Sequence, residues 1–226
     1  MILIIASELD EVAEAAVAEW PSRNAILMKP RDLCAQGWRI EVGRTYEGML
    51  IANGQLLPVA RVTGVLNRLS FVDERELVAI EPSDRRYVAA ELTAFVFYFL
   101  SQLQCRMINR PTVNNLGGCD WRLEEWAHYG HDQGIPFLSQ SMCGHASSQP
   151  AGQLRRTAIL NDAIVLSNDD QYQRNVAELV RRAGLVFADV CYLVRDHECL
   201  LHSVSLIPDL SSPEMARAVH RYFRDH

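Results

Sequence analysis

The chain has 226 residues, of which 49% are apolar and 22% are charged, and its net charge at pH 7 is −6. This length suits one large domain or two small ones, and the apolar content is sufficient for a buried core. The acidic balance excludes the basic stripe that marks a nucleic-acid-binding surface.

The chain begins with a short apolar run, Ile2–Ile5, followed closely by Glu8 and Asp10. Because this run lacks a basic leader and a cleavage site, it predicts a strand and not a signal peptide. The most apolar later stretch, residues 92–100, is too short to cross a bilayer. The six cysteines include no CxxC pair, which predicts reduced thiols. We therefore expect a soluble, cytoplasmic protein.

Helical and alternating patterns predict the elements of the first third of the chain. After the first strand, Ser7 is expected to cap a helix that Pro21 ends. Asn53-Gly54 is a strong turn signal. The other expected elements are strands at 25–28 and 62–68, a loop at 30–37, and a hairpin of 38–42 with 46–52 about Gly43-Arg44.

The stretch from Glu81 to Phe137 organises the rest of the chain. Ser83 is a good helix N-cap, and apolar residues then repeat at helical spacing as far as Leu103. Helix, strand, loop and helix in succession predict the core of an open α/β domain. The elements expected after the first helix are a strand at 107–109, a loop at 112–118, a helix at 120–133 and a strand from Gly134-Ile135-Pro136-Phe137 onward.

Residues 141–153 are rich in Ser, Gly and Pro and predict a linker. A last helix should open at Ser212-Pro213-Glu214, with serine at the N-cap and an acid in the first turn. Between them we expect a hairpin of 156–160 with 163–167 about Asn161-Asp162, a helix at 169–183, and strands at 186–194 and 199–206.

Two stretches together resemble a known family. The first contains Ile108-Asn109-Arg110-Pro111 and, after a helix, Gly134-Ile135-Pro136; the second runs from Val176 to Ser212. Their order is similar to that of the ATP-grasp superfamily, in its peptide-ligase and carboxylate–amine ligase branch. The resemblance implies an α/β fold with a Rossmann-like pre-ATP-grasp domain at 1–140. A reduced ATP-grasp-like α+β C-terminal subdomain would follow at 154–226.

The catalytic parts of the family do not carry over to this chain. Where the resemblance implies a Glu-Val-Asn motif that holds magnesium, this chain has Ser203-Val204-Ser205, and a serine hydroxyl is a poor substitute for a carboxylate. The family also uses two lysines to hold ATP phosphates, but Lys29 is the only lysine here. Finally, the linker at 141–153 stands where the family places a nucleotide-clasping subdomain.

Four arginines, Arg68, Arg85, Arg86 and Arg110, flank the predicted strand ends. Open α/β sheets bind ligands at such ends, so these residues are candidates for binding an anionic ligand. The alternative is that they are exposed arginines on solvated helices. The loop from Asn114 to Gly118 could hold an anion at the next helix N-terminus, although it lacks a diagnostic glycine spacing.

Three groups of His and Cys residues are candidate metal or nucleophile sites. His197 and Cys199 would share one face of a strand with His202 on the other, which disfavours a single metal site. The pair His128 and His131 lacks the further ligands of structural zinc. The remaining group, Cys143-Gly144-His145, lies in the linker with no orienting acid.

The favoured hypothesis is a degenerate, non-catalytic ATP-grasp-like protein without a cofactor. It would bind a protein or peptide partner, such as an active ATP-grasp relative, in a biosynthetic or peptide-modifying complex. A homo-oligomer is a second expectation, because the missing subdomain would leave surface uncovered and the last helix adds apolar Met215, Val219, Tyr222 and Phe223. The alternative is an ATP- and magnesium-dependent carboxylate–amine ligase in which arginines replace the lysines. A third class is a small-molecule or metal-sensing module.

Overall fold

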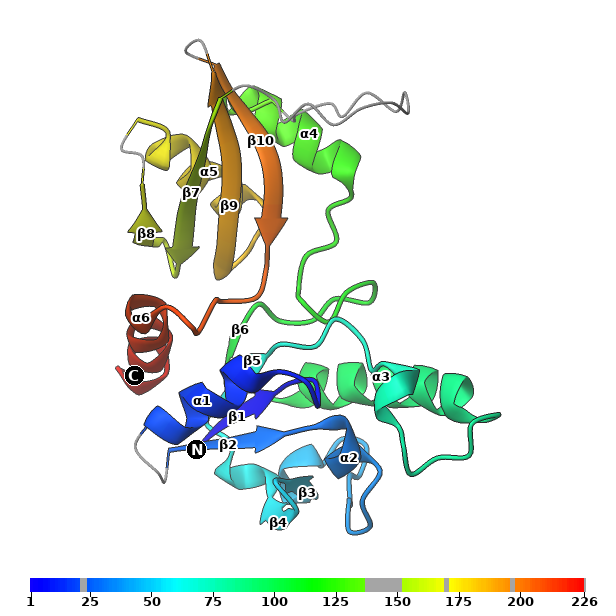
Figure 1. The fold of residues 1–226 in the computed structure, drawn as a ribbon. Helices are drawn as coiled ribbons and strands as arrows, with labels where there is room; N and C mark the ends of the chain where they lie inside the picture. Colours follow the sequence, from blue (N-terminus) through cyan, green and yellow to red (C-terminus); the bar gives the residue numbers. More distant parts are fainter. Residues whose placement is uncertain (21–23, 137–151, 169–170, 196–197, 226) are drawn as a thin grey trace. The chain divides into compact units, whose positions relative to one another are not determined.

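The computed structural model describes residues 1–20, 24–136, 152–168, 171–195 and 198–225 (Figure 1). Two compact units make up the chain. The first unit combines Met1–Gly118 with Asp209–His226, and the second unit is Cys119–Pro208. The first unit is therefore discontinuous in sequence, because the chain returns to it after completing the second.

The first unit is built on a four-stranded parallel sheet, as the early apolar runs predict. Its strand order is β2-β1-β5-β6. The strands are β1 (Ile2–Ile5), β2 (Ala25–Met28), β5 (Gly64–Asn67) and β6 (Arg106–Ile108). Every residue of β1 and β5 is buried, which matches the apolar sequence of β1 and of β5 up to Asn67.

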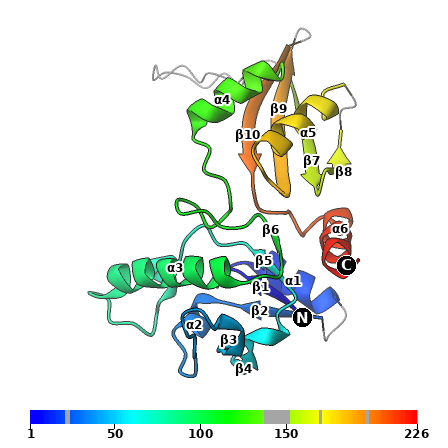
Figure 2. The ribbon, with the colours of Figure 1, turned by 180° about the vertical axis from the view of Figure 1, so that it is seen from behind.

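Helices cover both faces of this sheet (Figure 2). The long helix α3 (Arg85–Gln102) packs on one face, where Val96, Phe99 and Leu100 join the main core. Helices α1 (Glu11–Glu19) and α6 (Pro213–Arg224) lie next to each other, with the rings of Trp20 and His220 5.1 Å apart. A layered sheet with helices on both sides agrees with the expected Rossmann-like domain.

The last helix is not an uncovered surface, contrary to the sequence-based expectation. Met215 and Val219 are fully buried, and Tyr222 and Phe223 are partly buried within the first unit. A Cβ atom on Gly64 would lie only 2.6 Å from Cδ1 of Phe223, so the strand needs glycine there for α6 to approach. The apolar stripe of α6 is therefore core, and it gives no support to a homo-oligomer.

Several local predictions in the first unit need correction. The helix α1 is capped by Asp10, whose Oδ1 accepts a hydrogen bond from Ala13 N at 3.0 Å, and not by Ser7. The expected loop at 30–37 contains a short helix, α2 (Pro30–Leu33). Helix α3 begins after Asp84, one residue beyond the expected cap Ser83.

The hairpin of the first unit also lies elsewhere than predicted. Its strands are β3 (Met49–Ala52) and β4 (Gln55–Pro58), and they turn about Asn53-Gly54 instead of Gly43-Arg44. Both turn residues have positive φ, 49° and 67°, which is the backbone that an Asn-Gly pair adopts at low cost. The strong turn signal was correct, and the expected strand 46–52 contains β3. Its expected partner 38–42 contributes only one antiparallel bridge, between Arg39 and Met49, whereas the strand that pairs along β3 is β4, which was not predicted.

The second unit is a four-stranded antiparallel sheet with strand order β10-β9-β7-β8. Asn161 and Asp162 turn the predicted hairpin, with φ of 51° and 63°. The strands are β7 (Gln153–Leu160), β8 (Ala163–Ser167), β9 (Phe187–Arg195) and β10 (Glu198–Ser205). The expected strand after Gly134 continues into residues that lie outside the described part of the chain.

Both helices described in the second unit pack on one face of its sheet. Helix α4 (Leu123–Asp132) contributes Trp126, and α5 (Gln173–Arg182) contributes Val176 and Leu179, to a core with Val190 and Tyr192 of β9. The other face, which Figure 1 presents to the viewer, carries neither helix. We call this side of the sheet, which carries none of the described helices, the uncovered face, and it includes the positions that the family resemblance relates to magnesium.

The two units differ from the domain ranges expected at 1–140 and 154–226. Helix α4 belongs to the second unit, and α6 belongs to the first. The α/β class itself is confirmed by the parallel sheet, the antiparallel sheet and their helices. None of the described helices combines the length and the apolar content that crossing a bilayer requires.

Candidate functional site

The carboxyl edge of the parallel sheet is where an open α/β fold usually binds a ligand. Strand order reverses between β1 and β5, and open α/β sheets bind ligands at such a switch point. Here Arg68, directly after β5, forms an ion pair with Asp10: Nε lies 2.6 Å from Oδ2 and Nη2 lies 3.2 Å from Oδ1. Their side chains are only 9% and 15% exposed, so each charge is already neutralised inside the protein.

A second carboxylate fills the same edge. Glu76 accepts hydrogen bonds from Ser7 Oγ at 2.6 Å and from the backbone N of Glu8 at 2.7 Å. A backbone N–H and a hydroxyl after the first strand are the donors that an anionic ligand would use. Because Glu76 occupies these donors, the switch point is satisfied by the chain's own groups.

Beside this edge lies a preformed cavity, which we call the α3 groove. It has a volume of about 740 Å³ and lies between α3 and two loops, residues 70–75 and 112–116. Ala90, Ala94 and Phe97 of α3 form its floor, and Phe71 and Val113 stand on the two loops. Its size is within the range of pockets that hold ligands.

Two polar side chains fix the walls of the α3 groove. The buried Asn67 donates from Nδ2 to the carbonyl oxygens of Leu69 at 2.8 Å and Leu116 at 2.9 Å, which ties the two loops together. Thr93 Oγ1 accepts from the backbone N of Val72 at 3.0 Å and so joins α3 to the first loop. The sequence-based prediction missed both residues, although an asparagine at the end of the apolar run VTGVLNR was a usable signal.

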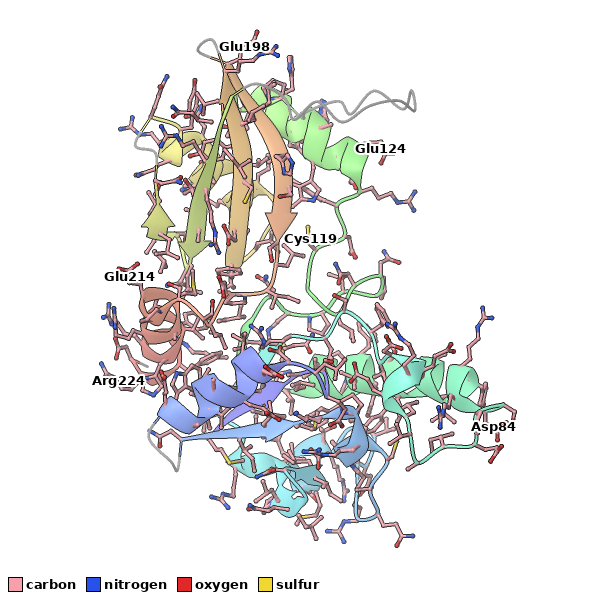
Figure 3. The ribbon with its side chains drawn as sticks, in the orientation of Figure 1. Asp84, Cys119, Glu124, Glu198, Glu214 and Arg224 are labelled. Atoms are coloured by element: carbon pink, nitrogen blue, oxygen red, sulfur yellow. The ribbon has the colours of Figure 1, made fainter. Side chains whose placement is uncertain are left out.

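The four predicted arginines do not converge on one site. Arg68 pairs with Asp10 at the switch point. Arg85 donates from Nε to the carbonyl oxygen of Ile80 at 2.9 Å, and Arg110 donates to those of Leu103 and Cys105. Only Arg86 lines the α3 groove, where its side chain is exposed. Arg86 is the second residue of α3, whose N-cap Asp84 is labelled in Figure 3.

The positions related to magnesium lie on the uncovered face of the second sheet. Ser203 and Ser205 of β10 are exposed and lie opposite Cys191 and Asp189 of β9. Asp189 supplies a carboxylate, but it forms an ion pair with Arg156 of β7, whose Nε lies 2.8 Å from Oδ1 and 2.6 Å from Oδ2. The aspartate inside the apolar run FADVCYLV is the sequence signal for this pair.

These donors do not fit a magnesium ion. Magnesium binds carboxylate and other hard oxygen ligands, whereas the groups here are two hydroxyls, a thiol and a carboxylate already held by arginine. Burial raises the pKa of the Cys191 thiol, and the Asp189 carboxylate raises that pKa further. The thiol therefore stays protonated at neutral pH, and a protonated thiol is a poor metal ligand.

The only lysine is also committed to structure. Lys29 is buried, and its Nζ pairs with Glu14 and donates to the carbonyl oxygen of Glu8 at 3.0 Å. It holds the end of β2 to the segment that precedes α1, so it is not free to contact a phosphate. Contacts to phosphate would therefore have to come from arginine.

The other candidate metal groups gain no support. Within the described residues, no three His, Cys, Asp or Glu side chains lie close enough to hold a metal ion. Cys199 is buried, whereas His202, His128 and His131 are exposed. His197 and the group Cys143-Gly144-His145 lie outside the described residues.

The chain was compared with known proteins. No protein-family model matches the sequence, and no curated protein matches it. Among solved structures, the macrocyclase MdnC from Microcystis aeruginosa, bound with precursor peptide MdnA, gives a TM-score of 0.72 at 11% identity. That match covers 100% of this chain and 99% of MdnC.

Two further structures give the same result. A RiPP-associated ATP-grasp ligase from Chryseobacterium gregarium, in complex with ADP and a leader and core peptide, gives a TM-score of 0.71 at 9% identity, covering 99% and 96% of the two chains. The macrocyclase MdnB from Microcystis aeruginosa gives 0.58 at 13% identity, covering 98% of each chain. In fold, therefore, this chain is similar to the ATP-grasp ligases, as its motifs predict.

Proposed function

We propose that this protein is a non-catalytic member of the ATP-grasp-like proteins that binds a peptide or protein partner in the cytoplasm. One observation carries the proposal: the uncovered face of the second sheet has Ser203 and Ser205 where metal ligands are expected, and its carboxylate Asp189 is held by Arg156. Next to the two serines the carboxylate is Asp189, and a carboxylate already held by arginine attracts a divalent cation only weakly.

The cations that could hold ATP phosphates are also committed to other partners. Phosphoryl transfer depends on positioned cations that neutralise the charge of the transferred group. Lys29 is paired with Glu14, and Arg68 is paired with Asp10. Arg68 would have to leave a largely buried partner before it could contact a nucleotide, and breaking a buried pair is costly. The Lys29 side chain is itself buried, so it would have to leave the protein interior to do so.

A peptide is the partner class best supported by the comparisons. MdnC and the Chryseobacterium ligase, whose folds this chain resembles, were both solved with peptides bound. A protein that keeps such a fold without its catalytic groups retains surfaces suited to a peptide or to an active relative. We propose this role within a biosynthetic or peptide-modifying complex.

Calorimetric titration with Mg-ATP tests the absence of catalysis at its first step. We expect no saturable heat up to millimolar nucleotide, with and without Mg²⁺. An active ATP-grasp ligase under the same conditions is the positive control. Saturable binding at micromolar Mg-ATP would contradict the proposal and favour the alternative, an ATP-dependent carboxylate–amine ligase that uses arginines for the phosphates.

A further inference from the structure

We propose that the free edge of strand β2 binds a peptide segment in extended conformation, which adds to the parallel sheet as a fifth strand. This inference rests on the proposed function and deepens it, because it names the surface and the conformation in which a peptide partner binds. It concerns only the first unit and does not depend on the face that carries Ser203 and Ser205.

Strand β2 lies at one end of the parallel sheet and pairs with β1 alone. Two hydrogen bonds show which of its backbone groups point toward β1. Ile2 N donates to the carbonyl oxygen of Asn24 at 2.6 Å, and Ala6 N donates to that of Met28 at 3.1 Å. Because the direction of backbone groups alternates along a strand, Ile26 between them also bonds to β1.

The remaining residues of the strand, Ala25 and Leu27, therefore point their N–H and C=O groups away from β1. Within the described residues, no group forms a hydrogen bond with these two N–H and two C=O groups. Unpaired backbone groups along a sheet edge are a template for a further strand. An extended peptide satisfies all four groups at once, whereas a helix has no backbone groups to offer along its side.

A cavity of about 690 Å³ lies along this edge, and we call it the β2 cleft. Figures 1 and 2 both show β2 between helix α1 and the β3–β4 hairpin. Apolar side chains from these three elements line the cleft: Ala25, Ile26 and Leu27, Val17 and Ala18, and Leu57. The cleft is thus large enough for the side chains of a short peptide strand, and its walls are already in place.

The recessed position of the edge favours a thin peptide over a folded partner. The β2 strand of a second copy is flanked by its own α1 and its own hairpin, and these would meet the walls of the cleft before the two strands could pair. A single extended segment has no such flanks. The occupant that fits the β2 cleft is therefore a peptide segment rather than another copy of this chain.

The charges in the cleft do not dominate the choice of peptide. Glu14 is paired with Lys29, and Arg31 is paired with Glu8 at 3.2 Å between Nη1 and Oε2. Arg61 also lines the cleft and is exposed to solvent, where its charge is screened. Backbone hydrogen bonds and apolar contacts are left to select the peptide, which should be rich in Val, Ile and Thr because these residues favour extended backbone.

Hydrogen exchange measured by NMR on the full chain tests whether the edge is open. The amides of Ala25 and Leu27 should exchange roughly 10-fold faster than those of Ile26 and Met28, which are bonded to β1. Equal protection of all four amides in the absence of peptide would show that the edge is already covered, by a second copy or by the chain itself, and would overturn the proposal.

A random hexapeptide library displayed on beads supplies the probe. The best selected peptide should slow exchange at Ala25 and Leu27 when it is added. N-methylation of its residues, one at a time, should weaken binding roughly 10-fold at every second position and less than about two-fold between them, because only alternate N–H groups face β2. Fluorescence anisotropy measures this binding, and a scan without alternation would contradict strand addition.

Two variants of the protein test whether the peptide binds at β2. Ala25→Pro removes an N–H that faces the cleft and keeps the bonds to β1, and an edge strand tolerates proline at such a position. It should weaken binding roughly 10-fold. Ala18→Glu places a charge in the apolar cleft from an exposed position on α1 and should weaken binding roughly 5-fold.

The matched control is Ala15→Glu, at an exposed alanine of the same helix that does not line the cleft, and it should leave binding within about two-fold. Equal binding by wild type and both cleft variants would overturn the site and leave a peptide-binding protein standing. Selection of no peptide would also overturn the site. Saturable binding of Mg-ATP contradicts the proposed function without touching the edge, so the two failures are distinguishable.

Discussion

In both units of this chain an arginine–aspartate ion pair lies near the place where the sheet would receive a ligand. In the first unit Arg68 and Asp10 meet at the switch point of the parallel sheet, and both side chains are largely buried. In the second unit Arg156 and Asp189 meet on the uncovered face of the antiparallel sheet, where the arginine is 37% exposed and the aspartate 7%. The first pair is shielded from water, and the second is half open to it.

This difference indicates what each pair does for the protein. A fully buried pair is costly to break, because either partner left alone is a charge without solvent. A pair that water reaches contributes less, because the solvent screens it. The first unit therefore uses its pair to hold strand β5 to helix α1, while the second unit uses its pair mainly to occupy a carboxylate.

Replacement of Arg68 should give the largest loss of stability. Arg68→Met keeps most of the side-chain volume but leaves the Asp10 carboxylate buried and unpaired, and we expect the free energy of unfolding to fall by about 3–5 kcal/mol. Urea unfolding followed by circular dichroism measures this. Arg44→Met, at an exposed arginine, should stay within about 0.5 kcal/mol. An equally small change for Arg68→Met would show that the buried pair is not structural.

Replacing either partner of the Arg156–Asp189 pair should cost less stability than Arg68→Met, and the two replacements should cost unequal amounts. Arg156→Met strands a buried carboxylate and should cost about 2–3 kcal/mol, whereas Asp189→Asn leaves only a partly exposed guanidinium and should cost roughly 1 kcal/mol. The same unfolding measurement compares them. If the two variants lost equal stability, exposure would not be what distinguishes the partners.

The hydrogen bonds by which Asn67 links the two loops of the first unit should contribute less to stability than either arginine. Asn67→Ala removes the amide that bonds Leu69 and Leu116, and we expect a loss of about 1–2 kcal/mol. Hydrogen exchange at residues 112–116 should rise at the same time, because the loop loses its tie. Asn24→Ala, at an exposed asparagine, is the control, and unchanged exchange in Asn67→Ala would contradict the role of the amide.

Restoring the expected metal ligands should have the smallest effect of these changes, because it should leave ATP turnover unchanged. The double variant Ser203→Glu with Ser205→Asn rebuilds the Glu-Val-Asn pattern on β10, but it frees neither Lys29 nor Asp189 from its partner. Transfer of a phosphoryl group also needs the phosphates held and neutralised. ADP release with amino acids and peptides present should therefore equal that of wild type. Turnover well above this background would show that the two serines alone abolish catalysis.

The sequence predicted regular elements better than it predicted the site. The strand Ile2–Ile5, the turn Asn161-Asp162 and the Ser212 cap were correct, because each depends on neighbouring residues. The partners of the arginines depend on tertiary contacts: Arg68 meets a residue 58 positions away, which no local pattern reveals. The same limit applies to the apolar stripe of α6, because the helix pattern alone does not reveal that this stripe packs on the first sheet.

Helix α6 has a consequence for the order in which the chain is made. Residues 119–208 are synthesised between the last strand of the parallel sheet and the helix that packs over Gly64. At the usual rate of about 5–20 residues per second, the ribosome needs roughly 5–20 s to reach α6 after Gly118. During that interval one face of the first sheet lacks its final cover, so the nascent chain is most exposed to aggregation and to chaperones then.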